Sequence, residues 1–117
     1  MSRHVTLIET AGGALSPLSA TATNLDLARA LSPALWLLVA PDALGVLHDC
    51  RVTLAALGRA PDALALSAAR ALDASSGTNA EELRWLGIAS PLCVLGPGAR
   101  SVAPLVEWLL RQDNQVQ

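Results

Sequence analysis

The sequence predicts an α/β fold in which strands alternate with helices along the chain. Runs of apolar, often β-branched residues recur, each of the kind that forms a strand buried on both faces. Helical patterns with capping residues lie between them. Strands joined by helices run parallel, with right-handed crossovers, so we expect a parallel sheet with helices on both faces, in three layers. With 117 residues, of which 52% are hydrophobic, residues 1–117 can form a single domain with a buried core.

The expected strands are short and apolar. They are Val5–Ile8, Ala34–Ala40, Leu64–Ser67 and Leu92–Leu95. Val5–Ile8 should lie centrally in the sheet, with neighbours on both sides, because a strand so apolar is usually covered all round. This strand begins almost at the first residue, so we expect a segment before Met1 or another chain to cover its edge. An uncovered edge would favour self-association.

The helices are predicted from their apolar faces and their caps. They are Asn24–Leu31, Val46–Leu57, Ala80–Leu86 and Ser101–Arg111. We expect Asn24 to cap the first helix and Gly58 to end the second. Either Thr78 or Asn79 can cap the third, and Gly87 can end it.

Composition excludes several classes of function. A formal net charge of −2, with 15% charged residues, provides no basic surface for nucleic acid or anionic lipid. The longest apolar runs fall well short of the roughly 20 residues that span a bilayer, and the first residues do not form a signal peptide. We therefore expect a cytoplasmic protein. Cys50 and Cys93 are not spaced as metal ligands, so reduced, buried thiols are expected.

One acidic residue lies where an α/β protein binds ligands. Glu9 stands at the end of the first expected strand and is followed closely by Ala11, Gly12 and Gly13. Parallel sheets gather ligands at the carboxyl ends of their strands. A carboxylate there can hold Mg²⁺, and the glycines let a phosphate or substrate approach the backbone. A strand end followed by a flexible turn explains the same pattern, and the pattern alone leaves both interpretations open.

The chain contains no lysine, because its eight basic residues are all arginine. A Walker A loop, G-x-x-x-x-G-K-[S/T], needs a lysine to reach the β- and γ-phosphates of a nucleotide. Nucleotide chemistry would therefore require a P-loop from elsewhere.

Ordered motifs in the first half of the chain resemble the second half of dethiobiotin synthetase. The family shows E-[G/T]-A-G-G, P-L-S, a T-N-x-D-L-A-like helix start, a strand and L-G-x-x-x-H. The corresponding segments here are Glu9–Gly13, Ser16–Ser19, Thr23–Ala28, Leu35–Ala40 and Leu44–His48. The rest of the chain matches by pattern only. The amidotransferase-type cobyrinate synthetases share the strand and its acidic turn, but Leu44–His48 fits them less well.

The resemblance implies a P-loop NTPase-like fold, of which this chain looks like the C-terminal half. It also implies a ligase of biotin biosynthesis that depends on ATP and Mg²⁺. In that reaction a diamine carboxylate, 7,8-diaminononanoate, takes up CO₂ as a carbamate, which ATP phosphorylates. The second amine then displaces phosphate and closes the ureido ring of dethiobiotin.

The resemblance also implies which residues form the site. Glu9 matches the acidic metal ligand, and the backbone of Ala11, Gly12 and Gly13 would lie beside the diamine and the transferred phosphate. No residue is assigned a catalytic role.

For two further segments the resemblance implies a binding role, although an ordinary structural explanation also fits each. In the family, the amides that correspond to Gly45, Val46 and Leu47 receive the substrate carboxylate across a homodimer interface, as a helix N-terminus can do. They equally fit an ordinary helix start. Gly96, Pro97 and Gly98 match a nucleotide-binding turn, or an ordinary loop. The asparagine with which the family reads adenine has no counterpart in Ala65–Arg70.

Two hypotheses follow. The chain is a fragment or one subunit of a split synthetase whose P-loop half is a separate partner, or it is a catalytically inactive binding or scaffold module that keeps the fold and the dimer surface. A neighbouring reading frame with a Walker A motif would favour the first.

Other candidate residues have structural explanations. His48 fits a helix surface, and Ser16 and Ser19 lack the partners of a hydrolase triad. We expect Trp36 to lie in a strand and Arg59 to be a solvated helix residue.

Overall fold

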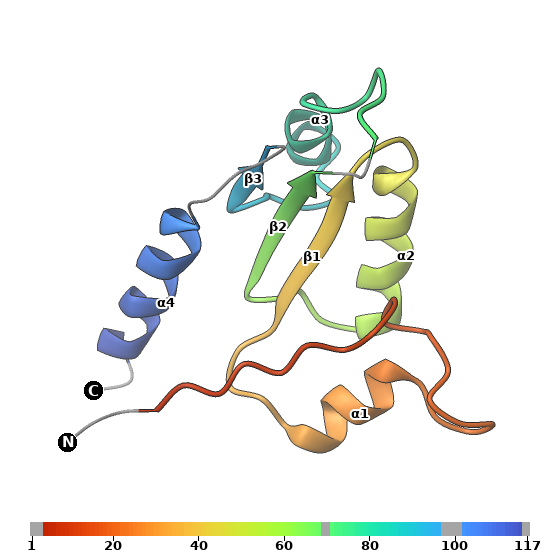
Figure 1. Cartoon of the computed structure of the whole chain (residues 1–117), viewed down its shortest axis with the longest axis vertical. Coiled ribbons are helices and arrows are strands. Elements are labelled where there is room, and N and C mark those ends of the chain that lie inside the picture. The colour runs from red at the N-terminus through yellow and green to blue at the C-terminus, as the bar shows by residue number, and fades with distance from the viewer. Residues whose placement is uncertain (1–3, 69–70, 97–101, 116–117) are drawn as a thin grey trace. The chain divides into compact units, whose positions relative to one another are not determined.

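The computed structural model describes residues 4–68, 71–96 and 102–115 (Figure 1). It divides into two compact units, Met1–Ala34 and Leu35–Gln117. The elements in chain order are α1 (Asn24–Leu31), β1 (Leu37–Asp42), α2 (Val46–Leu57), β2 (Ala63–Ala68), α3 (Asn79–Trp85), β3 (Cys93–Leu95) and α4 (Ala103–Gln115).

The larger unit contains a parallel sheet of three strands in the order β1-β2-β3. Leu37 of β1 pairs with Ala63 of β2, and Ala65 of β2 pairs with Cys93 of β3. The helices α2 and α3 connect successive strands. The α/β fold with a parallel sheet is therefore confirmed, and so are the last three of the expected strands.

One hydrophobic core joins the sheet to α2 and α3. Successive side chains of a strand point to opposite faces, so Leu64 and Leu66 share a face of β2, and Ala40 lies beside Leu66 in the paired strand. The core residues on this side are Ala40, Val46, Cys50, Leu64, Leu66, Ala80 and Leu83. Leu66 and Leu83 are completely buried. Each such leucine contributes about 1.5–3 kcal/mol relative to an exposed one.

The prediction that Val5–Ile8 form a strand is wrong. These residues have no regular secondary structure, and Val5, Leu7 and Ile8 are 67%, 85% and 59% exposed. A strand is stabilised by hydrogen bonds to a neighbouring strand, and this segment belongs to no sheet among the described residues. A β-branched, apolar run indicates strand propensity but does not supply the neighbour.

Pro41 lies inside β1 rather than beyond its end. The carbonyl oxygen of Trp36 accepts hydrogen bonds from the backbone amides of Asp62 and Ala63, at 2.9 and 3.2 Å. The backbone groups of a strand alternate in direction, so Leu38 and Ala40 also face β2, whereas Leu37, Val39 and Pro41 face away from it. Proline has no N–H to donate, and at this position the sheet loses no hydrogen bond.

Helix ends follow local capping chemistry. The N-cap of α1 is Thr23 and not Asn24, which is the first helical residue. The amide of Thr23 donates to the Asp26 carboxylate at 2.7 Å, and the amide of Asp26 donates to the Thr23 hydroxyl at 3.4 Å, which completes a capping box. The hydrogen bonds from Thr23 lower the pKa of Asp26.

The other helices begin and end near the expected residues. α2 has the predicted bounds and ends at Gly58, whose φ is 67°. α3 begins one residue early, at Asn79 after Thr78, and the last helix is shifted toward the C-terminus. No helix within 4–68, 71–96 and 102–115 is long and apolar enough to cross a membrane.

Candidate functional site

The turn after Glu9 lies in the smaller unit. Glu9 itself is exposed, and Gly12 has a φ of 82°, in the region that favours glycine. A Cβ atom at Gly12 would stand only 2.7 Å from the Ser16 hydroxyl oxygen, whereas a Cβ at Gly13 would be 3.9 Å from it. Position 12 therefore requires glycine both for its backbone angle and for the close approach of Ser16.

Asn24 holds this turn in place. Asn24 is 2% exposed, and its side-chain amide donates hydrogen bonds to the carbonyl oxygens of Ala11 and Gly13, at 2.7 and 2.9 Å. The backbone amide of Asn24 donates to the Ser16 carbonyl, and that of Leu25 to the Ala14 carbonyl. The Oδ1 atom of Asn24 is buried and accepts no hydrogen bond from the described residues. The first residue of α1 thus fixes the backbone around the glycines.

The start of α2 lies in the larger unit. Gly45 precedes the helix with a φ of 98°, and Val46 is 1% exposed in the core. The amide of the preceding residue, Leu44, donates to the Asp73 carboxylate at 2.8 Å. That hydrogen bond, followed by those from Ser75, lowers the pKa of Asp73. The first turn of α2 is therefore joined to the loop between β2 and α3.

A buried carboxylate at the end of β1 organises the same loop. Asp42 is 7% exposed. Its two carboxylate oxygens accept hydrogen bonds from the side-chain amide of Asn79, at 2.8 Å, and from the backbone amide of Gly77, at 2.9 Å. Its backbone carbonyl accepts from the hydroxyl of Ser76, also at 2.8 Å. A buried carboxylate is costly to desolvate, and these donors offset that cost.

A small pocket opens at the carboxyl ends of all three strands. Its volume is about 250 Å³, and it is lined by Asp42, Ala68, Leu72, Ser76, Gly77, Val94, Leu95 and Gly96. Parallel sheets bind ligands at this end. Gly96, one of the three predicted nucleotide-binding residues, lines the pocket, whereas Pro97 and Gly98 fall outside the described residues.

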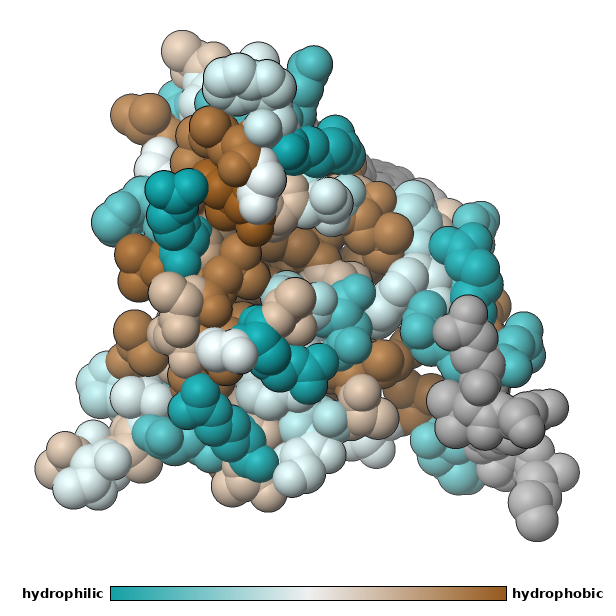
Figure 2. All heavy atoms as spheres, turned by 180° about the vertical axis from the view of Figure 1, so that it is seen from behind, coloured by the Kyte–Doolittle hydropathy of each residue, from teal (hydrophilic) through white to brown (hydrophobic). Residues whose placement is uncertain are grey.

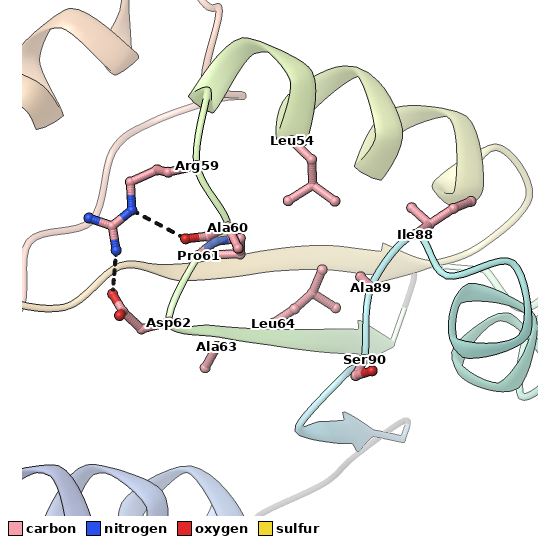
Figure 3. A pocket seen from close by; sticks show the side chains of 10 residues that line it. All are labelled: Leu54, Arg59, Ala60, Pro61, Asp62, Ala63, Leu64, Ile88, Ala89 and Ser90. Carbon is pink, nitrogen blue, oxygen red and sulfur yellow. Dashed lines mark hydrogen bonds and ion pairs between the residues drawn. The ribbon is translucent and has the colours of Figure 1, made fainter.

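A larger pocket, of about 390 Å³, lies at the opposite ends of the strands (Figure 3). Leu54 of α2, Leu64 of β2 and Ile88 after α3 form its apolar walls, and Arg59 and Asp62 stand at one end. These two side chains form an ion pair at 3.2 Å, so neither charge is left to attract a ligand. We favour the strand-end pocket as the functional one because parallel sheets bind ligands at the carboxyl ends of their strands.

Arg59 and Trp36 differ from expectation. Trp36 precedes β1, and the Arg59 guanidinium lies 5.6 Å from the centre of its indole ring. Arg59 follows α2 and is paired with Asp62, so it is not simply a solvated helix residue. Asp62 also accepts a hydrogen bond from the Trp36 amide at 2.7 Å. These contacts join the residue before β1 to the residues before β2.

The thiols and His48 match their structural explanations. Cys50 and Cys93 are free and buried, and burial raises the pKa of both thiols. A protonated, buried thiol is a poor nucleophile. His48 is exposed on α2.

Glu9 offers a single carboxylate for a metal. The described residues contain no group of three or more histidine, cysteine or acidic side chains able to hold a metal ion. Mg²⁺ is commonly bound through one or two carboxylates together with water and substrate phosphates, so one exposed glutamate fits part of such a site. The remaining ligands would have to come from the nucleotide, from water or from another polypeptide.

Comparison with known proteins identifies a relative. The ATP-dependent dethiobiotin synthetase of Rhodopirellula baltica is 36% identical over 128 aligned positions, which take in 85% of this chain. The chain resembles a dethiobiotin synthetase. The resemblance inferred from the ordered motifs is thereby confirmed. The chain spans about half of this relative, 48% of its length. No family model and no solved structure matches the chain.

The predicted site residues fall into both units. Glu9, Ala11, Gly12 and Gly13 belong to Met1–Ala34, and Gly45, Val46, Leu47 and Gly96 belong to Leu35–Gln117. Within each unit the structure shows which groups support them. Asn24 supports the first set, while Asp42 and Asp73 organise the loop beside the second.

The supporting residues were missed in the sequence. Asp42 ends an apolar run, and the segment Asp73–Asn79 is a cluster of turn and capping residues. Such residues are typical of loops that fold on their own hydrogen bonds. That signal marks a structured loop, but it does not say that the loop closes on Asp42.

Proposed function

We propose that this chain belongs to the dethiobiotin synthetase family and supplies one half of such an enzyme, as a fragment or as one subunit of a split enzyme whose P-loop half is supplied in addition. The similarity to the R. baltica synthetase carries the proposal, because it covers most of this chain and about half of that protein. The single domain of residues 1–117 is then a partial one, completed by the partner. The expected location is the cytoplasm.

The proposed substrates are ATP, CO₂ and 7,8-diaminononanoate. Glu9 would supply an oxygen ligand to Mg²⁺, which neutralises phosphate charge in phosphoryl transfer. The backbone at Ala11–Gly13, held by Asn24, would face the diamine and the transferred phosphate. This geometry supports the proposal because the Asn24 hydrogen bonds fix the backbone of the turn, and Gly12 and Gly13 have no side chains.

The proposed carboxylate site is the first turn of α2. The amides of Gly45, Val46 and Leu47 lie at the positive end of the helix dipole, which favours an anion. The Val46 amide also donates to the Ala43 carbonyl at 3.2 Å. In a homodimer of the completed enzyme, this turn would receive the substrate carboxylate across the interface. Gly96 would contribute to the nucleotide site from the strand-end pocket.

The chain alone should not be active, because it contains no lysine to reach the γ-phosphate. The test is therefore reconstitution. The purified chain is mixed with the part of the R. baltica synthetase that it does not match, and dethiobiotin formation is measured with ATP, Mg²⁺, bicarbonate and the diamine. We expect turnover only in the mixture. Turnover by the isolated chain, free of contaminating synthetase, would contradict the proposal.

A variant tests the role of Glu9. Glu9→Gln is nearly isosteric but replaces a charged oxygen ligand by a neutral amide, which binds a hard cation poorly. We expect the reconstituted mixture to lose Mg²⁺-dependent turnover. The matched control is Glu107→Gln on the exposed surface of α4, which should keep it. Unchanged activity and Mg²⁺ dependence in Glu9→Gln would show that Glu9 does not bind the metal.

A further inference from the structure

The outer edge of β1 carries unpaired backbone groups. β1 pairs with β2 on one side, and the described residues place no strand on the other. Leu37, Val39 and Pro41 direct their backbone groups to that side, as the hydrogen bonds to the Trp36 carbonyl establish. Leu37 and Val39 each present an N–H and a C=O group there, whereas Pro41 has no N–H and its carbonyl already accepts a hydrogen bond from the Ala43 amide at 2.9 Å.

From Leu37 to Ala40 this edge has the composition of an interior strand, whereas Pro41 is typical of an edge. Leu37 and Val39 are 45% and 55% exposed on one face, while Leu38 and Ala40 point to the other. Figure 2 shows that apolar side chains reach the surface on one face of the molecule. A strand that is apolar on both faces is typical of the middle of a parallel sheet. Edge strands in solution are usually protected by charged residues, and none occurs between Leu37 and Pro41.

A parallel strand fits this edge better than a second copy of β1. Two copies related by a two-fold axis would pair antiparallel. With the axis at Val39, Pro41 of one copy would lie opposite Leu37 of the other, whose carbonyl would then find no N–H donor. A parallel strand can pair along Leu37–Ala40 and end before the proline. All strands of the described sheet are parallel, so such a neighbour continues it.

We propose that the outer edge of β1, from Leu37 to Ala40, binds a parallel, apolar strand of the polypeptide that supplies the P-loop half. This inference rests on the proposed function. Its occupant is supported by the length of the R. baltica relative, of which the chain spans 48%. A parallel α/β enzyme of that length has further strands with which an edge can pair.

The test uses a charge placed on the edge. Val39→Lys puts a charged side chain on the sheet face, beside the side chains that a partner strand would bring, without removing a hydrogen bond between β1 and β2. Val52→Lys is the matched control, because Val52 is 43% exposed and lies on α2. Binding to the unmatched part of the R. baltica synthetase is measured by calorimetry. We expect Val39→Lys to weaken the complex at least tenfold and Val52→Lys to change its affinity less than twofold.

Amide hydrogen exchange gives an independent readout. The Leu37 and Val39 amides should exchange fast in the free chain and become protected in the complex. Protection of both amides in the free, monomeric chain would overturn the proposal, since a segment of the chain itself would then cover the edge. A homodimer that Val39→Lys dissociates would overturn it in favour of a second copy. Equal binding by both lysine variants would overturn it as well.

These experiments distinguish a failure of the proposed interface from a failure of the proposed function. A complex that is sensitive to Val39→Lys but forms no dethiobiotin would support the interface and contradict the proposed function. Turnover that is insensitive to Val39→Lys would support the function and contradict the interface.

Discussion

The side chains of Asp42 and Asn79 meet at 2.8 Å, and both are almost completely buried. Asp42 ends β1, and Asn79 begins α3, so this hydrogen bond joins elements separated by 37 positions in sequence. Together with the hydrogen bond from Gly77, it fixes the loop that borders the strand-end pocket.

The first prediction exchanges the aspartate and the asparagine of this pair. Asp42→Asn should place an amide N–H against the N–H donor of Asn79 or Gly77, at a cost of about 1–3 kcal/mol for the unsatisfied buried group. Asn79→Asp should put two carboxylates face to face and cost at least as much. In the double variant, the new amide at position 42 can donate to the new carboxylate at position 79 and still accept from Gly77, so part of the lost free energy of unfolding should return. Urea unfolding of the four proteins measures this coupling. Additive losses would contradict the proposed geometry.

A second prediction concerns pH and the loop that Asp73 holds. The hydrogen bonds from the amides of Leu44 and Ser75 lower the pKa of Asp73 below its ordinary value of 3.8. A depressed folded-state pKa adds stability above the unfolded pKa and loses it as pH falls through the folded pKa. We therefore expect the Leu44 amide to be protected from hydrogen exchange at neutral pH and to lose protection in acid, below about pH 4.

The control for this titration is Asp73→Asn. An uncharged side chain should give weaker protection of Leu44 at neutral pH and little dependence on pH over the acidic range. The Asp73 carboxyl shift, followed by NMR, should have its midpoint below 3.8. A midpoint at or above that value would show that these hydrogen bonds do not favour the ionised form.

Local patterns in the sequence predicted much of the fold. Val46–Leu57 was predicted with both ends correct, because an apolar stripe and a following Gly58 define a helix without reference to the rest of the chain. The strand Leu64–Ser67 was found within one residue at each end, since β2 is apolar throughout. In both segments, local preference and burial favour the same structure.

Errors arose where a distant partner decides the structure. Val5–Ile8 has the composition of a strand, but pairing depends on a neighbour that composition cannot reveal. Asn24 was predicted as a cap, whereas its side chain bonds to Ala11 and Gly13 and Thr23 closes the capping box. The hydrogen bond between Asp42 and Asn79 was missed for the same reason. The motif residues could be predicted from resemblance, but the side chains that hold them could not.

The last prediction compares the adjacent glycines of the Glu9 turn. Gly12→Ala should be strained, because its φ of 82° is unfavourable for alanine and its Cβ would stand 2.7 Å from the Ser16 hydroxyl oxygen. Together these effects should cost about 1–3 kcal/mol locally. Gly13→Ala should be nearly neutral, because its Cβ would lie 3.9 Å from the same atom. Hydrogen exchange of the Ser16 and Leu25 amides, which bond to the carbonyls of Gly13 and Ala14, measures the stability of the turn.

Adding Ser16→Ala separates the two causes of that strain, which are the contact with Ser16 and the backbone angle of residue 12. Removing the hydroxyl oxygen abolishes the contact at 2.7 Å but leaves the backbone angle of residue 12 unchanged. The double variant should therefore recover only part of the protection that Gly12→Ala loses. Complete recovery would show that the contact alone matters, and equal exchange in Gly12→Ala and Gly13→Ala would show that neither feature constrains the turn.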